Sequence, residues 1–92
     1  MQEIRQMTDT VQDWLNGMML RGLNQLSPGD LNQLRAYAER AAQLHMDELC
    51  RLLNQLADTG QAALLGSEDR TIISDYFRLS AYIQMASASL AE

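Results

Sequence analysis

The sequence predicts an all-α fold, a compact antiparallel bundle of three to four helices that forms a single domain over residues 1–92. Apolar residues recur in alternating steps of three and four along most of the chain, which is the period of an amphipathic helix. No segment shows the every-second-residue alternation of a strand. Glycine, proline and capping residues divide the chain, and the expected helices cover about 3–25, 28–44, 47–65 and 68–90. A chain of this length builds one modest hydrophobic core.

The first expected helix, about 3–25, follows an apolar stripe typical of a helix with one buried face. The members of this stripe are Ile4, Met7, Val11, Trp14, Leu15, Met18, Gly22 and Leu26. We expect Trp14 and Leu15 to lie in the core. The second half of the helix is also apolar outside the stripe, at Met19, Leu20 and Leu23. That surplus predicts either a central position in the bundle or a partner that covers it.

The second expected helix, 28–44, has the clearest start signal in the chain. Ser27 is a capping residue, Pro28 suits the first helical position, and Asp30 stands where the acid of a capping box belongs. The apolar stripe that follows consists of Leu31, Leu34, Ala38 and Ala41. A helix that continued unbroken to residue 65 would have about 38 residues and a length of roughly 57 Å, too long for a domain of this size. A break is therefore expected, and 45–47 is the best place for it.

The third expected helix, 47–65, begins at that break. Asp47 is predicted to cap it and to form an ion pair with Arg51, four residues further on. Its apolar stripe consists of Leu49, Leu52, Leu53 and Leu56. Gly66 is a good residue to end the helix. Gly60 is either a small interior residue on the apolar face or an earlier stop, and both interpretations stay open.

The fourth expected helix, 68–90, has the most regular period of the four. Ser67 is expected to cap it, and Glu68 and Asp69 supply the acids of its first turn. Its apolar stripe consists of Ile72, Tyr76, Leu79, Ile83, Ala86 and Leu90, and the apolar residues beside it are Ile73, Phe77, Tyr82 and Met85. This helix therefore has more apolar surface than one neighbour covers. The short connections make consecutive helices antiparallel neighbours.

Composition argues against several classes of function. Twelve acidic and seven basic residues give a net charge of -5, which repels nucleic-acid phosphates and acidic membrane surfaces. All seven basic residues are arginines, and they form no cluster in the sequence. No apolar run is long enough to cross a bilayer, so no membrane partner is expected. The first residues show no basic stretch followed by an apolar block, so we expect no secretory signal and a cytoplasmic location.

The chain offers little to a metal ion or an active site. His45 and Cys50 are its only histidine and cysteine, so neither an internal disulfide nor a zinc site is expected. On a continuous helix their side chains would point roughly 140° apart. We expect His45 to be partly buried and hydrogen-bonded near a helix junction, and Cys50 to be a small buried hydrophobe. No catalytic, cofactor-binding or metal-ligating residue is predicted, and an enzyme is the least favoured class.

Three stretches of the chain share a pattern with a known family. A Trp-Leu start at Trp14 leads to an Arg-Gly-Leu turn at Gly22, an alanine-rich stretch covers 38–42, and a leucine-rich stretch covers 49–57. Together they resemble the helical segment that accompanies the SWIM zinc finger in some bacterial proteins. The zinc motif of that family needs several cysteines and a histidine, which this chain lacks, so the zinc-dependent activity is not carried over. The resemblance implies a helical companion module with a helix break near His45.

These observations predict a non-enzymatic helical protein–protein interaction or companion module. Its partner would be another protein or a second copy of the chain in a homodimer. The expected interaction residues, for which core and interface positions are equally weighted, are Met19, Leu20, Leu23, Tyr82 and Met85. The alternative is a small helical regulator associated with nucleic acid, against which the acidic charge argues.

Overall fold

Four α-helices and no strand make up the computed structural model over the residues that it describes, 2–22, 26–66 and 71–90. The helices are α1 (Gln2–Arg21), α2 (Pro28–Gln43), α3 (Asp47–Leu64) and α4 (Thr71–Leu90). The all-α prediction is confirmed. No helix in these described ranges combines the length and apolarity that a membrane span requires.

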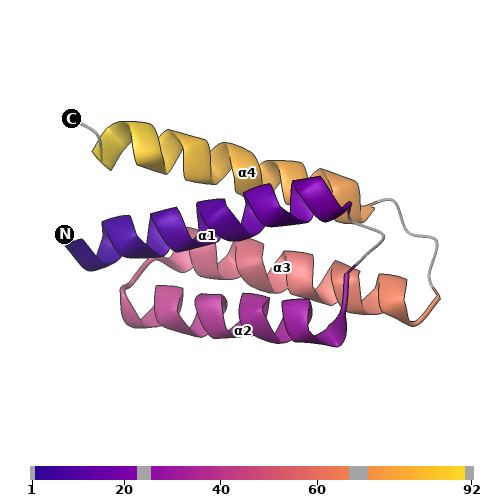
Figure 1. Cartoon of the computed structure of the whole chain (residues 1–92). Coiled ribbons are helices and arrows are strands. Elements are labelled where there is room, and N and C mark those ends of the chain that lie inside the picture. The colour runs from indigo at the N-terminus through magenta and orange to yellow at the C-terminus, as the bar shows by residue number, and fades with distance from the viewer. Residues whose placement is uncertain (1, 23–25, 67–70, 91–92) are drawn as a thin grey trace.

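Consecutive helices run antiparallel, and α4 returns beside α1 to close the bundle (Figure 1). The bundle measures 41 × 24 × 19 Å along its principal axes. The most extensive contact joins α2 to α3, and α4 packs on both α3 and α1. Among neighbouring pairs, α1 and α2 make the smallest contact. The end of α1 and the start of α4 lie at the same end of the bundle, which places their apolar side chains close together.

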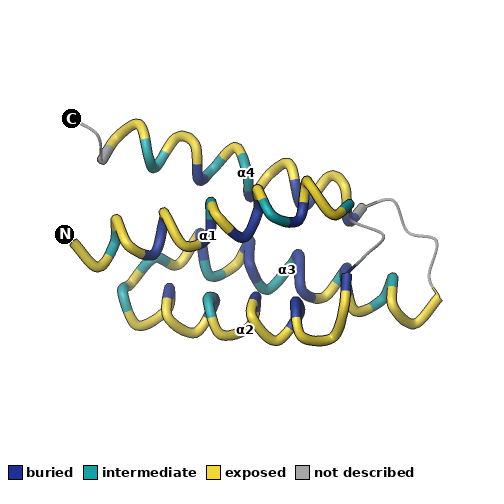
Figure 2. Tube along the Cα trace, in the orientation of Figure 1, coloured by how far each residue is buried: buried dark blue, intermediate teal, exposed yellow. Residues whose placement is uncertain are grey.

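One continuous core runs between the four helices, and the predicted apolar stripes supply it (Figure 2). Trp14 and Leu15 both lie in this core, as predicted. The large apolar side chains with almost no exposed surface are Val11, Leu15, Met18, Leu34, Leu49, Leu53, Leu56, Leu79 and Ile83. Burial of a Leu or Ile side chain contributes about 1.5 to 3 kcal/mol, so this shared core is the main term that stabilises the bundle.

The prediction that the first helix reaches residue 25 is wrong, because α1 ends at Arg21. Gly22 has a positive φ of 88°, and its N–H still donates to the carbonyl of Met18 at 2.8 Å. A left-handed residue after the last turn ends a helix, and glycine adopts that conformation without steric cost. Leu26, the last member of the predicted apolar stripe, is buried although it lies outside α1.

A capping box starts α2, as predicted. The N–H of Ser27 donates to Asp30 Oδ2 at 3.0 Å, and the N–H of Asp30 donates to Ser27 Oγ at 3.4 Å. Arg21, the last residue of α1, donates from Nη2 to Asp30 Oδ1 at 3.1 Å. Burial alone would raise the pKa of the Asp30 carboxyl, but the hydrogen bonds from Ser27 and Arg21 outweigh it and hold the pKa below its usual value. Asp30 thus joins the end of α1 to the start of α2.

The predicted break between the second and third helices is confirmed, and a Schellman turn forms it. His45 has a φ of 61°; its N–H donates to Ala42 O at 3.1 Å, and the N–H of Met46 donates to Ala41 O at 2.8 Å. The prediction that Asp47 caps α3 is wrong. The N-cap is Met46, whose side chain makes no capping bond, and Asp47 is the first residue of the helix.

The two glycines discussed for α3 have separate roles. The helix ends at Leu64, and Gly66 follows with a φ of 97°, which agrees with its predicted role at the helix end. Gly60 is an interior residue of α3 rather than a stop. A Cβ at Gly60 would lie 2.7 Å from Leu31 Cδ2, so glycine is what lets the side chain of Leu31 approach α3 this closely. The predicted start of the fourth helix at 68, with Ser67, Glu68 and Asp69, lies outside the described residues.

Candidate interaction surface

Large apolar side chains are exposed mainly at one end of the bundle. Among the described residues, seven large apolar side chains are exposed, and six of them lie near the end of α1, the end of α3 or the first two turns of α4. They are Met19, Leu20, Leu64, Leu65, Ile73 and Phe77, and the seventh is Met85, further along α4. Exposed apolar residues that gather in this way mark interaction sites more often than residues scattered singly.

A shallow hollow of about 340 Å³ lies between α1 and α4. Its lining is almost entirely apolar and consists of Met19, Gly22, Ile73, Tyr76 and Phe77. Tyr76 forms a fixed part of this lining, because its hydroxyl donates to the carbonyl of Leu15 at 2.6 Å and its ring is buried. Burial raises the pKa of the Tyr76 hydroxyl, which stays neutral and a donor at physiological pH.

Phe77 stands beside this hollow with more than half of its side chain in solvent. Its ring packs edge to face on Tyr76, with 5.7 Å between the ring centroids. Its exposed fraction is 58%. The ring thus packs on the buried Tyr76 on one side and meets solvent on the other. Aromatic side chains are enriched at protein interfaces, so Phe77 is a candidate anchor residue.

The outward side of α4 is almost free of charge. Arg78 is its only exposed charged residue, because Asp75 is buried. We define the α4 face as the uncharged exposed residues that follow one another along this side, which are Ser74, Phe77, Ala81, Gln84, Met85 and Ala88. Figure 2 shows the outer edge of α4 exposed along its length.

The other described helices carry acids on their exposed sides. Exposed acidic residues occur on α1 at Glu3, Asp9 and Asp13, on α2 at Glu39, and on α3 at Asp47, Glu48 and Asp58. Exposed acids outnumber exposed arginines on α1 and α3, whereas on α2 Arg35 and Arg40 outnumber Glu39. The α4 face itself carries no charge, so an apolar partner meets no charged side chain on it.

The five interaction residues expected from the sequence lie in different environments. Met19, Leu20 and Met85 are exposed by 62%, 89% and 72%. Tyr82 is half-buried and packs against the core. Leu23 lies outside the described residues. The structure brings Met19 together with Ile73 and Phe77, which sequence reasoning had noted only as flanking apolar residues.

Sequence reasoning also missed the small residues of the α4 face. Ser74, Ala81 and Ala88 have little or no apolar side-chain surface, so a search for surplus large hydrophobic residues passes over them. The available signal was the absence of charge, because no acidic or basic residue occurs between Arg78 and Glu92.

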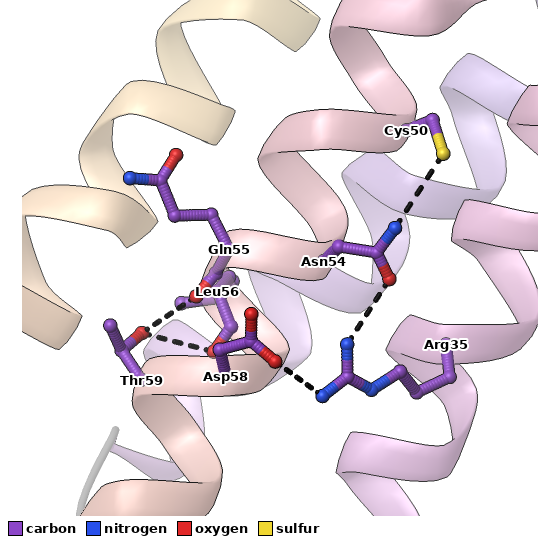
Figure 3. A network of polar contacts seen from close by, with 7 residues as sticks. All are labelled: Arg35, Cys50, Asn54, Gln55, Leu56, Asp58 and Thr59. Carbon is purple, nitrogen blue, oxygen red and sulfur yellow. Dashed lines mark hydrogen bonds and ion pairs between the residues drawn. The ribbon is translucent and has the colours of Figure 1, made fainter.

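Another side of the bundle, between α2 and α3, is joined by polar contacts (Figure 3). Arg35 on α2 reaches α3 with two hydrogen bonds, to Asp58 Oδ1 at 2.6 Å and to Asn54 Oδ1 at 3.2 Å. The Asn54 amide in turn donates to Cys50 Sγ at 3.6 Å. Cys50 is half-buried rather than fully buried as expected. These contacts join α2 to α3. The polar groups of Arg35, Asn54 and Asp58 are therefore already hydrogen-bonded within the chain.

His45 and Arg51 also differ from the sequence-based expectations. His45 is exposed at the turn between α2 and α3, not partly buried. Arg51 pairs with Glu48, one turn away, instead of with Asp47. The hydrogen bond from Arg51 lowers the pKa of the Glu48 carboxyl, although both side chains are more than half exposed. Within the described ranges, no three His, Cys, Asp or Glu residues gather into a group that could hold a metal ion.

Comparison with protein-family models, curated proteins and solved structures finds no significant match to this chain. The resemblance to the helical segment beside the SWIM zinc finger therefore stays a prediction.

Proposed function

We propose that this chain is a non-enzymatic helical interaction module that binds a protein partner through the α4 face and the adjoining end of α1. The observation that supports this proposal is the combination of exposed Phe77 and Met85 with a nearly uncharged helix side. Interface cores are enriched in aromatic residues and methionine and depleted in charge, and Phe77, Met85 and the lack of exposed acids agree with these trends.

The surface combines an aromatic side chain with flexible ones. Phe77 packs on Tyr76, whereas Met19 and Met85 have long unbranched side chains that adapt to a partner. Leu20, exposed by 89%, is a further exposed apolar side chain near the end of α1. A cytoplasmic setting belongs to the same proposal, because the half-buried free thiol of Cys50 suits a reducing compartment.

Charge substitutions on this surface test the proposal. In Leu20→Glu and Met85→Glu, we expect retention of any partner to fall at least tenfold, because a carboxylate would be desolvated on binding. Both residues are exposed in the free chain, so the far-ultraviolet circular dichroism and the thermal midpoint should match wild type within a few degrees. The measurement is an affinity pull-down of the tagged chain from the cytosol of its own source, with quantitation of each retained protein, including an untagged second copy.

A matched control lies on α2. Ala36 is exposed in the middle of that helix, away from α4, and Ala36→Glu introduces the same charge. Its retention of partners should equal that of wild type. Equal retention by Leu20→Glu, Met85→Glu and Ala36→Glu would exclude this surface, and unfolding of the first two variants would place their side chains in the core.

A further inference from the structure

We propose that the partner of the α4 face is a second copy of this chain, with the two α4 helices packed antiparallel about a two-fold axis at Ala81. This inference rests on the proposed function, because it names the partner of the same surface. Three features of α4 support it, namely its register, its charge and its length.

The register of the α4 face is self-complementary. Ala81 lies in the middle turn of Thr71–Leu90, and an antiparallel copy centred there places Phe77 opposite Met85 of the second copy. Both side chains are more than half exposed, and a thioether against an aromatic ring is a favourable contact. The same symmetry places Ser74 opposite Ala88, so small residues oppose small residues at both ends.

Ala81 meets its own copy at the axis. Because alanine has no side chain beyond Cβ, the two helices can pack closely there, within the usual range of interaxial distances of about 8 to 10 Å. A two-fold interface uses the same patch twice, so each large residue must find its partner within one face. The pairs of Phe77 with Met85 meet that requirement on both sides of Ala81.

The charge of the chain favours this face over the other sides. Two copies with a net charge of -5 repel each other, and exposed acids outnumber exposed arginines on α1 and α3, so that repulsion is strongest along those two helices. In the antiparallel register Arg78 lies opposite the neutral Gln84 of the second copy. The two arginines stand about 9 Å apart along the axis, so no like charges meet directly.

The length of α4 limits the expected affinity of the dimer. Twenty residues give a helix about 30 Å long. One pair of helices of this length makes a small interface, so we expect a reversible dimer with a dissociation constant of the order of micromolar. Met19 and Ile73, beside Phe77, add apolar surface at each end of the interface.

Opposite charges placed on the axis give the decisive experiment. Ala81→Glu and Ala81→Lys each set two like charges against each other, so each variant alone should dissociate at least tenfold more readily than wild type in sedimentation equilibrium. An equimolar mixture of the two should recover dimers, because Glu then faces Lys. The matched control, Ala36→Glu, should dimerise as wild type does. Failure of the mixture to recover dimers would overturn the axis at Ala81.

Cysteine cross-linking checks the register independently in a Cys50→Ser background. Under mild oxidation, Ala81→Cys should form a covalent dimer, whereas the exposed Ala36→Cys should not. Phe77→Cys mixed with Met85→Cys should cross-link, and Phe77→Cys alone should not. Cross-linking of Phe77→Cys with itself in preference to the mixture would show a parallel or shifted arrangement.

The outcomes separate this inference from the proposed function. A wild-type chain that stays monomeric at several hundred micromolar overturns the self-association. The interaction module itself survives that result if a different protein is retained and is lost in Leu20→Glu and Met85→Glu. It fails as well if neither a dimer nor any retained protein responds to these substitutions.

Discussion

At the scale of single residues, Trp14 combines a large apolar contribution with an unpaired polar atom. Its side chain lies in the core with only 8% exposed. Its indole Nε1 is the one buried side-chain nitrogen or oxygen without a hydrogen-bond partner among the described residues. A buried donor left unpaired costs about 1 to 3 kcal/mol, so the net contribution of Trp14 is smaller than its buried area suggests.

Two substitutions at Trp14 should separate the stabilisation from its buried ring from the cost of its unpaired N–H. Trp14→Ala should lower the free energy of unfolding by about 3 to 5 kcal/mol, because it leaves a cavity in the core. Trp14→Phe should cost less than about 1.5 kcal/mol, because it keeps an aromatic ring and removes the unpaired N–H. Chemical denaturation measures both values. Equal losses for the two variants would show that the indole makes a polar contact that stabilises the fold.

Asp30 gives the stability of the fold a defined pH dependence. The folded pKa of its carboxyl is held below the usual value of 3.8, so its contribution is complete above about pH 5 and is lost as the pH falls through the folded pKa. Asp30→Asn should be less stable than wild type at neutral pH by about 1 kcal/mol, the typical value of a cap. That difference should shrink below pH 4 in urea denaturation. A constant difference from pH 7 to pH 2.5 would show that the charge of Asp30 has no part in it.

At the scale of elements, the turn between α2 and α3 depends on a residue in an unfavourable conformation. His45 occupies the left-handed position of the Schellman turn, where a side chain clashes with the backbone and glycine does not. The helix end forms nonetheless, because the N–H groups of His45 and Met46 satisfy its last carbonyls. The imidazole of His45 is exposed to solvent.

His45→Gly should therefore stabilise the protein. The relief of left-handed strain exceeds the extra entropy of glycine in the unfolded chain, and we expect a gain of about 0.5 to 1 kcal/mol. The thermal midpoint should rise by a few degrees. His45→Ala, which keeps a Cβ in the same conformation, should show no such gain; a rise of equal size in both variants would contradict the argument from backbone strain.

At the scale of the whole molecule, the sequence predicts the helices and the core well, because both follow from apolar period and capping residues. The stripe positions Leu34, Leu53 and Ile83 are fully buried, and the capping box at Ser27 forms. The end of α1 escaped prediction for a physical reason. The spacing of apolar residues indicates which positions are buried, but it does not indicate the backbone angles. The predicted stripe therefore includes Gly22 and Leu26, although the helix ends at Arg21.

The interaction surface could be predicted only in part. Surplus apolar residues on the first and fourth helices were visible in the sequence, but which of them point outward depends on where the neighbouring helices lie. Tyr82 and Met85 are three residues apart, roughly 60° around the helix, and that angle separates a half-buried side chain from one that is 72% exposed. Only the placement of α3 and α1 against α4 decides between them.

The uneven packing of the four helices also bears on the order in which the chain folds. The α2–α3 hairpin joins residues that are near in sequence, so its formation costs little loop-closure entropy. The bond from Tyr76 to the carbonyl of Leu15 closes a loop of 61 residues, and α1 packs less extensively on α2, its neighbour along the chain, than on α4. The first helix thus depends on the last one for its place in the core, and a nascent chain cannot dock α1 fully until α4 has been synthesised.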